Sequence, residues 1–206
     1  MYINFTPPSN DSIRAEWGTT VAPCPPEARL GYRAPIIRKF DARYATGCAK
    51  KIRVSAARFD VPSLAHYLSS RYAAGWNIGQ FCLVPMQRFC ARYDDPDTAA
   101  SCSERWEVSQ NDSGMFTAAA IWAEWEDPTN GQAVDSFSIL TIATDDHAIN
   151  NNVQRRVGNE QSLVVIPQVR RSGWLHATPQ AAADSLLPFA TALFQSDASR
   201  VRIERI

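Results

Sequence analysis

The stretch FTAAAIWAEWEDPTNGQAVDSFSILTIAT, residues 116–144, decides the expected fold of this chain. It contains two runs rich in apolar, aromatic and β-branched residues, 116–126 and 134–144, which predict two strands. Between the runs stands Thr129-Asn130-Gly131, and an Asn-Gly step in such a place is a strong short-range signal for a hairpin turn. The chain is therefore expected to be built on antiparallel sheet.

Further segments extend the strand pattern on both sides. Strands are predicted at 81–86, 88–93 and 104–110, and the β-branched run 163–166 predicts a buried strand. The tail after Asp197 alternates apolar and charged residues, which leaves two interpretations, an edge strand or a frayed end. The proline-rich segment 22–35 is expected to be irregular.

Three short helices are predicted around these strands. Each begins at a Ser, Thr or Pro, residues that favour the first turn of a helix. The first predicted helix is capped by Pro7-Pro8-Ser9-Asn10 and runs through Trp17, with Gly18 ending it; the others run from Pro62 to about Gly75 and from Thr178 to Leu187. Strands and helices together predict a β-rich α+β fold.

Composition excludes several classes of protein. The 206 residues are 45 % apolar and 20 % charged, which is ordinary usage for a globular protein that buries a core. One domain spanning residues 1–206 is expected from this length. No apolar run has the length of a membrane span, and no basic region followed by an apolar stretch opens the chain. We therefore expect a cytoplasmic protein without a membrane anchor.

Cysteine and histidine spacing indicates neither a disulfide framework nor a metal site. The five cysteines include no C-x-x-C pair, and an odd number of them fits a reducing compartment. The three histidines, His66, His147 and His176, have no metal-ligand spacing to a cysteine or to one another. We expect no metal, no cofactor and a monomer, and we expect Cys90 to be a buried core residue.

Charge is balanced overall but unevenly distributed. The formal net charge is zero, yet residues 33–58 hold eight Lys and Arg against a single acidic residue, Asp41. A local excess of this size is able to pair with phosphates, and it is also typical of an ordinary solvated face. The distribution by itself leaves both interpretations open.

Several motifs resemble, in order along the chain, those of one known family. Gly79-Gln80-Phe81-Cys82-Leu83-Val84-Pro85 followed by Phe89 is similar to the strand G-Q-R-C-L-V-P-A-D-x-F-Y-E of that family. Residues 115–128 resemble its hairpin A-G-L-W-x-x-W-x-D-P, and residues 137–175 resemble its motifs F-T-I-L-T, H-P-L-M, V-V-I-L-P and W-L. Residues 1–9 resemble its opening, M-C-x-x-Y-x-P-P-S. This is the SOS response-associated peptidase (SRAP) family.

The resemblance covers roughly residues 1–190 and implies a SRAP-like fold of coiled antiparallel sheets with short peripheral helices. It also implies a reaction. In the family, an N-terminal cysteine freed by removal of methionine captures the aldehyde of an abasic site in single-stranded DNA, and its amine and thiol close a thiazolidine ring. Residue 2 here is Tyr2, which has no thiol and whose bulk should keep Met1 in place. Neither reacting group is therefore expected.

At three further positions this sequence lacks the residue that the family uses for its chemistry. The carboxylate of F-Y-E aligns with Ala91, and a methyl group cannot transfer a proton. The family's histidine aligns with Gln154, whose amide does not titrate near neutrality. The asparagine of N-A-R-x-E-T aligns with Ala56, whereas its arginine survives as Arg58. Four such changes in one chain predict the loss of covalent capture and of autoproteolysis.

Three functional hypotheses remain at this stage. The first is a single-stranded DNA-binding relative without the covalent step, in which the expected phosphate contacts are Arg58, Lys50, Lys51, Arg53, Arg155 and Arg156. The second is a structural or interaction protein that keeps only the scaffold, which the zero net charge favours. The third is an active SRAP-type peptidase or lyase that works through substituted residues. Fold similarity does not choose among them, because function resides in the site.

Overall fold

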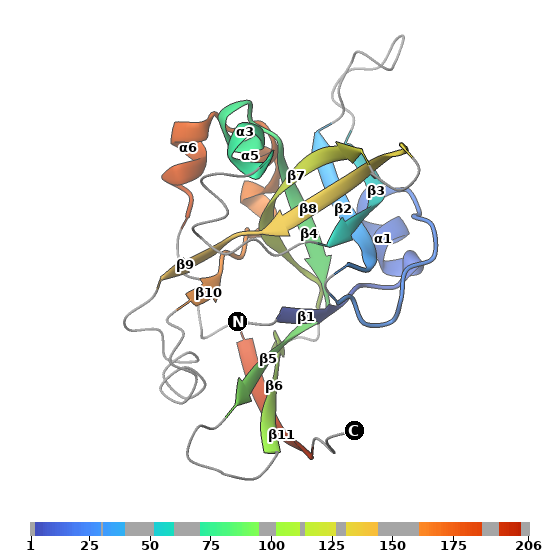
Figure 1. Ribbon diagram of the computed structural model, residues 1–206, viewed down its shortest axis with the longest axis vertical. Helices are drawn as coiled ribbons and strands as arrows, with labels where there is room; N and C mark the ends of the chain where they lie inside the picture. Colours follow the sequence, from blue (N-terminus) through green and yellow to red (C-terminus); the bar gives the residue numbers. More distant parts are fainter. Residues whose placement is uncertain are drawn as a thin grey trace.

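The computed structural model describes residues 3–29, 31–39, 52–59, 71–94, 102–111, 114–126, 131–143, 161–186 and 194–202, and these form a β-rich α+β structure (Figure 1). The strands are β1 Ile3–Thr6, β2 Arg33–Lys39, β3 Ile52–Phe59, β4 Phe81–Met86, β5 Arg88–Asp94, β6 Cys102–Gln110, β7 Phe116–Glu126, β8 Ala133–Ile139, β9 Thr141–Ala143, β10 Gln161–Leu163 and β11 Phe194–Arg202. The helices are α1 Asn10–Trp17, α3 Arg71–Asn77, the 3-10 turn η2 Gln168–Arg170, α5 Arg171–Leu175 and α6 Pro179–Ala183. The expected fold class is confirmed at this level.

Five strands curl into a closed sheet. Their order is β2-β3-β8-β7-β4, and β4 returns to β2 through the pairs Ile37–Leu83 and Arg38–Cys82. All neighbours are antiparallel except β3 and β8, which run parallel where Arg58 lies across from Ser136. Closure gives every strand of this sheet two neighbours, although β2 meets β4 and β3 meets β8 through only two residue pairs each.

A second sheet extends from one end of the barrel, as the ribbon shows (Figure 1). Its order is β1-β5-β6-β11, with antiparallel pairing throughout. The strand β11 lies at its edge and pairs only with β6 among the described strands. Of the two interpretations of the C-terminal tail, the edge strand is therefore confirmed for residues 194–202, and it begins earlier than expected.

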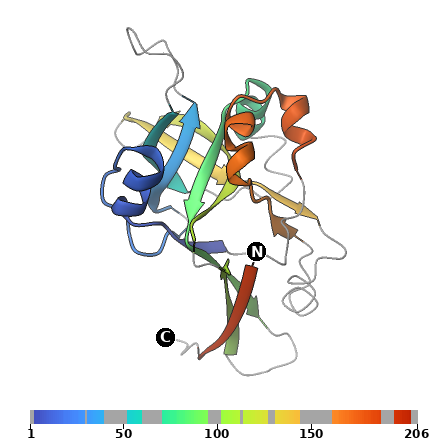
Figure 2. The ribbon, with the colours of Figure 1, turned by 180° about the vertical axis from the view of Figure 1, so that it is seen from behind.

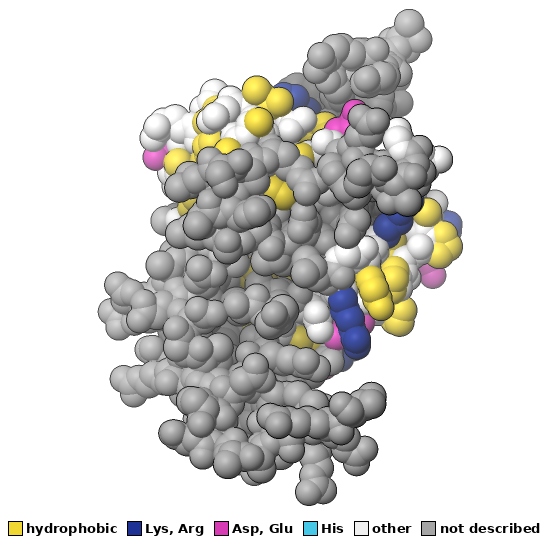
Figure 3. All heavy atoms as spheres, in the orientation of Figure 1, with side chains coloured by type: hydrophobic (Ala, Val, Ile, Leu, Met, Phe, Trp, Pro, Cys, Tyr) yellow, Lys and Arg dark blue, Asp and Glu magenta, His cyan; other side chains and the backbone are white. Residues whose placement is uncertain are grey.

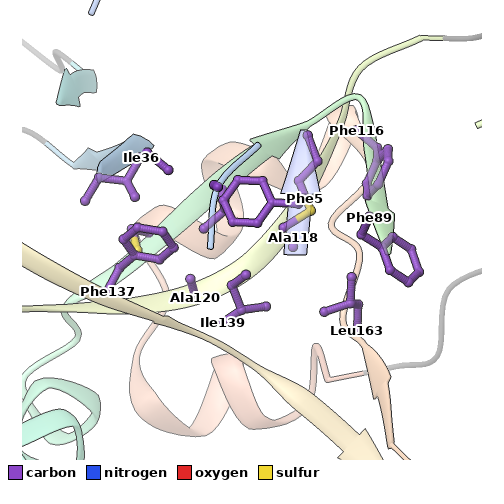
Figure 4. Close-up of a cluster of buried hydrophobic side chains, with 14 of the residues drawn as sticks. Phe5, Ile36, Phe89, Phe116, Ala118, Ala120, Phe137, Ile139 and Leu163 are labelled. Atoms are coloured by element: carbon purple, nitrogen blue, oxygen red, sulfur yellow. The ribbon is translucent and has the colours of Figure 1, made fainter. Parts of the chain in front are cut away.

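Two apolar clusters lie on the two faces of the barrel wall. The first fills the barrel and continues onto the second sheet; Figure 4 shows Phe5, Ile36, Phe89, Phe116 and Phe137 converging in it. The second lies outside the barrel, where α3, α5 and α6 cover the wall (Figure 2). It contains Tyr72, Phe81 and Trp174. The six residues of β4 are all buried, because alternate side chains enter the two clusters.

The predicted bounds of several elements are confirmed and others are wrong. The strands 81–86 and 116–126 agree residue for residue with β4 and β7, and the first predicted helix ends at Trp17 as α1 does. Ser9 caps α1 by accepting a hydrogen bond from the Ser12 backbone N–H, and Gly18 ends it with a φ of 68°. The third predicted helix begins as expected, with the Thr178 hydroxyl accepting from the Ala181 N–H, but it ends at Ala183 instead of Leu187.

Gly75 does not end the second predicted helix. It lies inside α3, which continues to Asn77, and Gly79 supplies the left-handed residue after it, with a φ of 72°. A Cβ on Gly75 would stand 3.1 Å from the Trp122 carbonyl oxygen and 3.1 Å from Ile121 Cγ2. Gly75 is therefore a contact point between α3 and β7, and this close approach explains the glycine. The start of the predicted helix, from Pro62, lies outside the described residues.

Other differences concern strands. The predicted strand 134–144 is interrupted at Leu140, between β8 and β9. The Leu140 side chain lies in the outer cluster, and its N–H donates to the Ala119 carbonyl. Of the predicted strand 163–166, only Leu163 belongs to a regular strand, as the last residue of β10, and Val165 forms an isolated bridge to Ala118. The expectation of irregular structure up to residue 35 is wrong at its end, because β2 begins at Arg33.

Candidate nucleic-acid interface

The basic segment 33–58 includes the antiparallel pair β2 and β3. Its register sets Arg33 across from Arg58 and Arg38 across from Arg53. Residues 40–51 lie outside the described residues, and with them Lys50 and Lys51; Arg155 and Arg156 lie outside them as well. The structure thus brings Arg53 and Arg58 of the predicted set onto one strand, β3, and adds the arginines of β2 beside them.

Arg38 belongs to this basic segment by sequence, but its charge is used inside the protein. Its guanidinium donates two hydrogen bonds to the Asp135 carboxylate, at 3.1 Å and 2.8 Å, and its Cζ lies 4.2 Å from the centre of the Trp122 ring. The side chain is 10 % exposed. A cation paired in this way is not free to meet a phosphate, so the count of available charges in the segment falls by one.

Arg33 and Lys39, at the two ends of β2, are different. Both are exposed, and neither has an acidic partner within the described ranges. The strand between them is buried, because its residues line the barrel interior on one face and meet the outer cluster on the other. The fold therefore keeps the exposed cations of β2 at the rims of the barrel.

The N-terminal strand reaches one of the changed family positions. β1 pairs with β5, and Ile3, the residue after Tyr2, lies directly across from Ala91. On its other side Ala91 lies across from Trp106 of β6. Ala56 is in the other sheet, on β3, across from Pro35. Tyr2 and Gln154 lie outside the described residues.

The thiols that the structure describes near these strands are not poised for reaction. Cys90 is 3 % exposed, as expected from the sequence, and its Sγ lies 3.8 Å from Glu107 Oε1. Cys82 is completely buried, and burial raises the pKa of its thiol well above the usual value. In the parts of the chain that the structure describes, no three His, Cys, Asp or Glu side chains come together as a metal site requires.

Sequence reasoning missed a second internal cation. Arg171, at the start of α5, lies 2.6 Å from Glu16 of α1, donates to the Thr117 hydroxyl at 3.2 Å, and has its Cζ 5.6 Å from the Trp17 ring. Burial lowers the pKa of this guanidinium, and Glu16 opposes that shift. Arg171 and Glu16 are 155 residues apart, so no local sequence pattern predicts their contact. Its role here is to hold α1 against the barrel.

The strands β2 and β3 were missed as well. A signal for β3 exists, because Ile52-Arg53-Val54-Ser55 alternates apolar and polar residues. For β2, Pro35 argues against a strand, but in the structure Pro35 pairs with Ala56 and the strand continues past it.

No helix within the described ranges is long and apolar enough to span a membrane.

Comparison with known proteins supplies a fold and no family. No protein-family model matches the chain, and no curated protein matches it. A solved structure from Bordetella bronchiseptica matches with a TM-score of 0.71 and 17 % identity, covering 97 % of this chain and 99 % of that one. A structure from Bacteroides thetaiotaomicron matches with a TM-score of 0.70 and 15 % identity, covering 96 % and 91 %.

A third solved structure, a phage-related protein from Bordetella bronchiseptica, matches with a TM-score of 0.63 and 13 % identity, covering 96 % of this chain and 93 % of that one. At identities this low a likeness shows the fold alone. The chain therefore shares, over nearly its whole length, the β-rich α+β fold of these bacterial proteins.

Proposed function

We propose that this chain is a SRAP-like domain that binds single-stranded DNA and no longer forms a covalent bond with abasic sites. The observation that carries the proposal is the pairing of Ile3 with Ala91. The family's capture reaction requires a thiol on residue 2 and a carboxylate at the position of Ala91, and Ile3, the first described residue, pairs with Ala91 here. Neither position holds the required group.

Phosphate binding is supported by the pair β2 and β3. The exposed Arg33 and Lys39 stand on β2, and Arg53 and Arg58 stand on β3. We propose that Arg58, Lys50, Lys51, Arg53, Arg155 and Arg156 contact the backbone of the strand, as the resemblance implies. Arginine is suited to this role because its planar guanidinium holds phosphate oxygens in pairs.

The test is binding of a fluorescent single-stranded oligonucleotide, with and without one abasic site, over a series of salt concentrations. We expect affinity to fall with salt by a log–log slope of about 0.7 per phosphate contacted. Both oligonucleotides should bind equally, and neither should give an adduct that survives heating in detergent. A heat-stable adduct, located by peptide mass, would instead support the active enzyme with substituted residues.

A second function, a scaffold or interaction protein, is favoured by the way the described cations are used. Arg38, Arg88 and Arg171 each form an ion pair within the chain, with Asp135, Glu107 and Glu16. On the face shown in Figure 3, the Lys and Arg side chains of the described residues form separate spots and no continuous patch. Absence of any salt-dependent DNA binding at low ionic strength would select this second function.

A further inference from the structure

We draw no further inference here: the strongest candidate, the outer edge of β11 (Phe194–Arg202) in the second sheet, pairs with no strand other than β6 within the described residues, but nothing in the structure shows what covers it.

Discussion

Arg38 and Asp135 lie 97 residues apart in the chain and meet through two parallel hydrogen bonds, with the Trp122 ring against the guanidinium. Their side chains are 10 % and 21 % exposed. The pair connects β2 to β8 across β3, so it helps to hold the closed sheet together at that rim. A buried pair of this kind stabilises little by itself, but removal of one partner leaves a charge without compensation.

Asp135→Ala should therefore be strongly destabilising. We expect a loss of about 3 kcal/mol in the free energy of unfolding, because Arg38 would stay buried without its carboxylate. The measurement is urea unfolding followed by tryptophan fluorescence. Arg88→Ala is the matched control, since the Arg88–Glu107 pair is 49 % and 33 % exposed and should contribute less than about 1 kcal/mol. Equal losses in the two variants would contradict the structural role given to Asp135.

Two glycines in helices should respond in opposite ways to substitution by alanine. Alanine normally stabilises a helix by about 0.5–1 kcal/mol relative to glycine. Gly173 of α5 has no atom within 4 Å of the position of a Cβ, so Gly173→Ala should show this gain. At Gly75 the Cβ would stand 3.1 Å from a backbone oxygen of Trp122, and Gly75→Ala should lower stability. Thermal unfolding of the two variants measures the difference, and a gain at both sites would disprove the close approach of α3 to β7.

Cys24 reports on the electrostatic surroundings of Arg33. Partial burial raises the pKa of the Cys24 thiol, and the charge of Arg33 works in the opposite direction. The thiolate is the reactive form, so alkylation of Cys24 at pH 8 should be slower than that of an unstructured cysteine peptide. Arg33→Ala should raise the pKa further and slow the reaction again. Peptide mass spectrometry over a pH series follows this one thiol. A faster reaction in Arg33→Ala would contradict the lowering of the Cys24 pKa by Arg33.

Phe5, at the junction of the two sheets, should contribute strongly to the free energy of unfolding although β1 is short. Phe5 is completely buried in the cluster that fills the barrel and reaches the second sheet. Phe5→Ala should cost about 3–5 kcal/mol through lost burial and the cavity left behind. Val169→Ala, at a residue that is 92 % exposed, should change stability by less than about 0.5 kcal/mol. Chemical denaturation of both variants is the measurement.

Local patterns in the sequence predict the elements whose signals are local. The strands 81–86 and 116–126 contain enough apolar, aromatic and β-branched residues to be recognised without any partner, and Ser9 and Gly18 mark both ends of α1. The helix end near Gly75 was misjudged because a glycine required for close packing resembles a glycine required for termination. The two differ only in what lies opposite, which is β7 in this fold.

The candidate site depended on information that no local pattern holds. That Arg33 stands across from Arg58, and that Arg38 is neutralised while Arg33 is not, follows from strand register and from a carboxylate far away in the chain. A count of charges from the sequence treats every Lys and Arg of the segment as equally available. Only the closed sheet decides which of them face solvent. The roles of Tyr2 and Gln154 remain predictions, as do those of Lys50, Lys51, Arg155 and Arg156.

The placement of β1 decides which changes near the first described residues the fold tolerates. Phe5 fills the core, the Phe5 N–H and carbonyl both bond to Ala28, and Ile3 to Thr6 pair with β5. The first strand is therefore needed for folding, whatever residue precedes it. A substitution before Ile3 leaves these contacts in place, whereas deletion of Ile3–Thr6 removes both a paired strand and the Phe5 ring from the core.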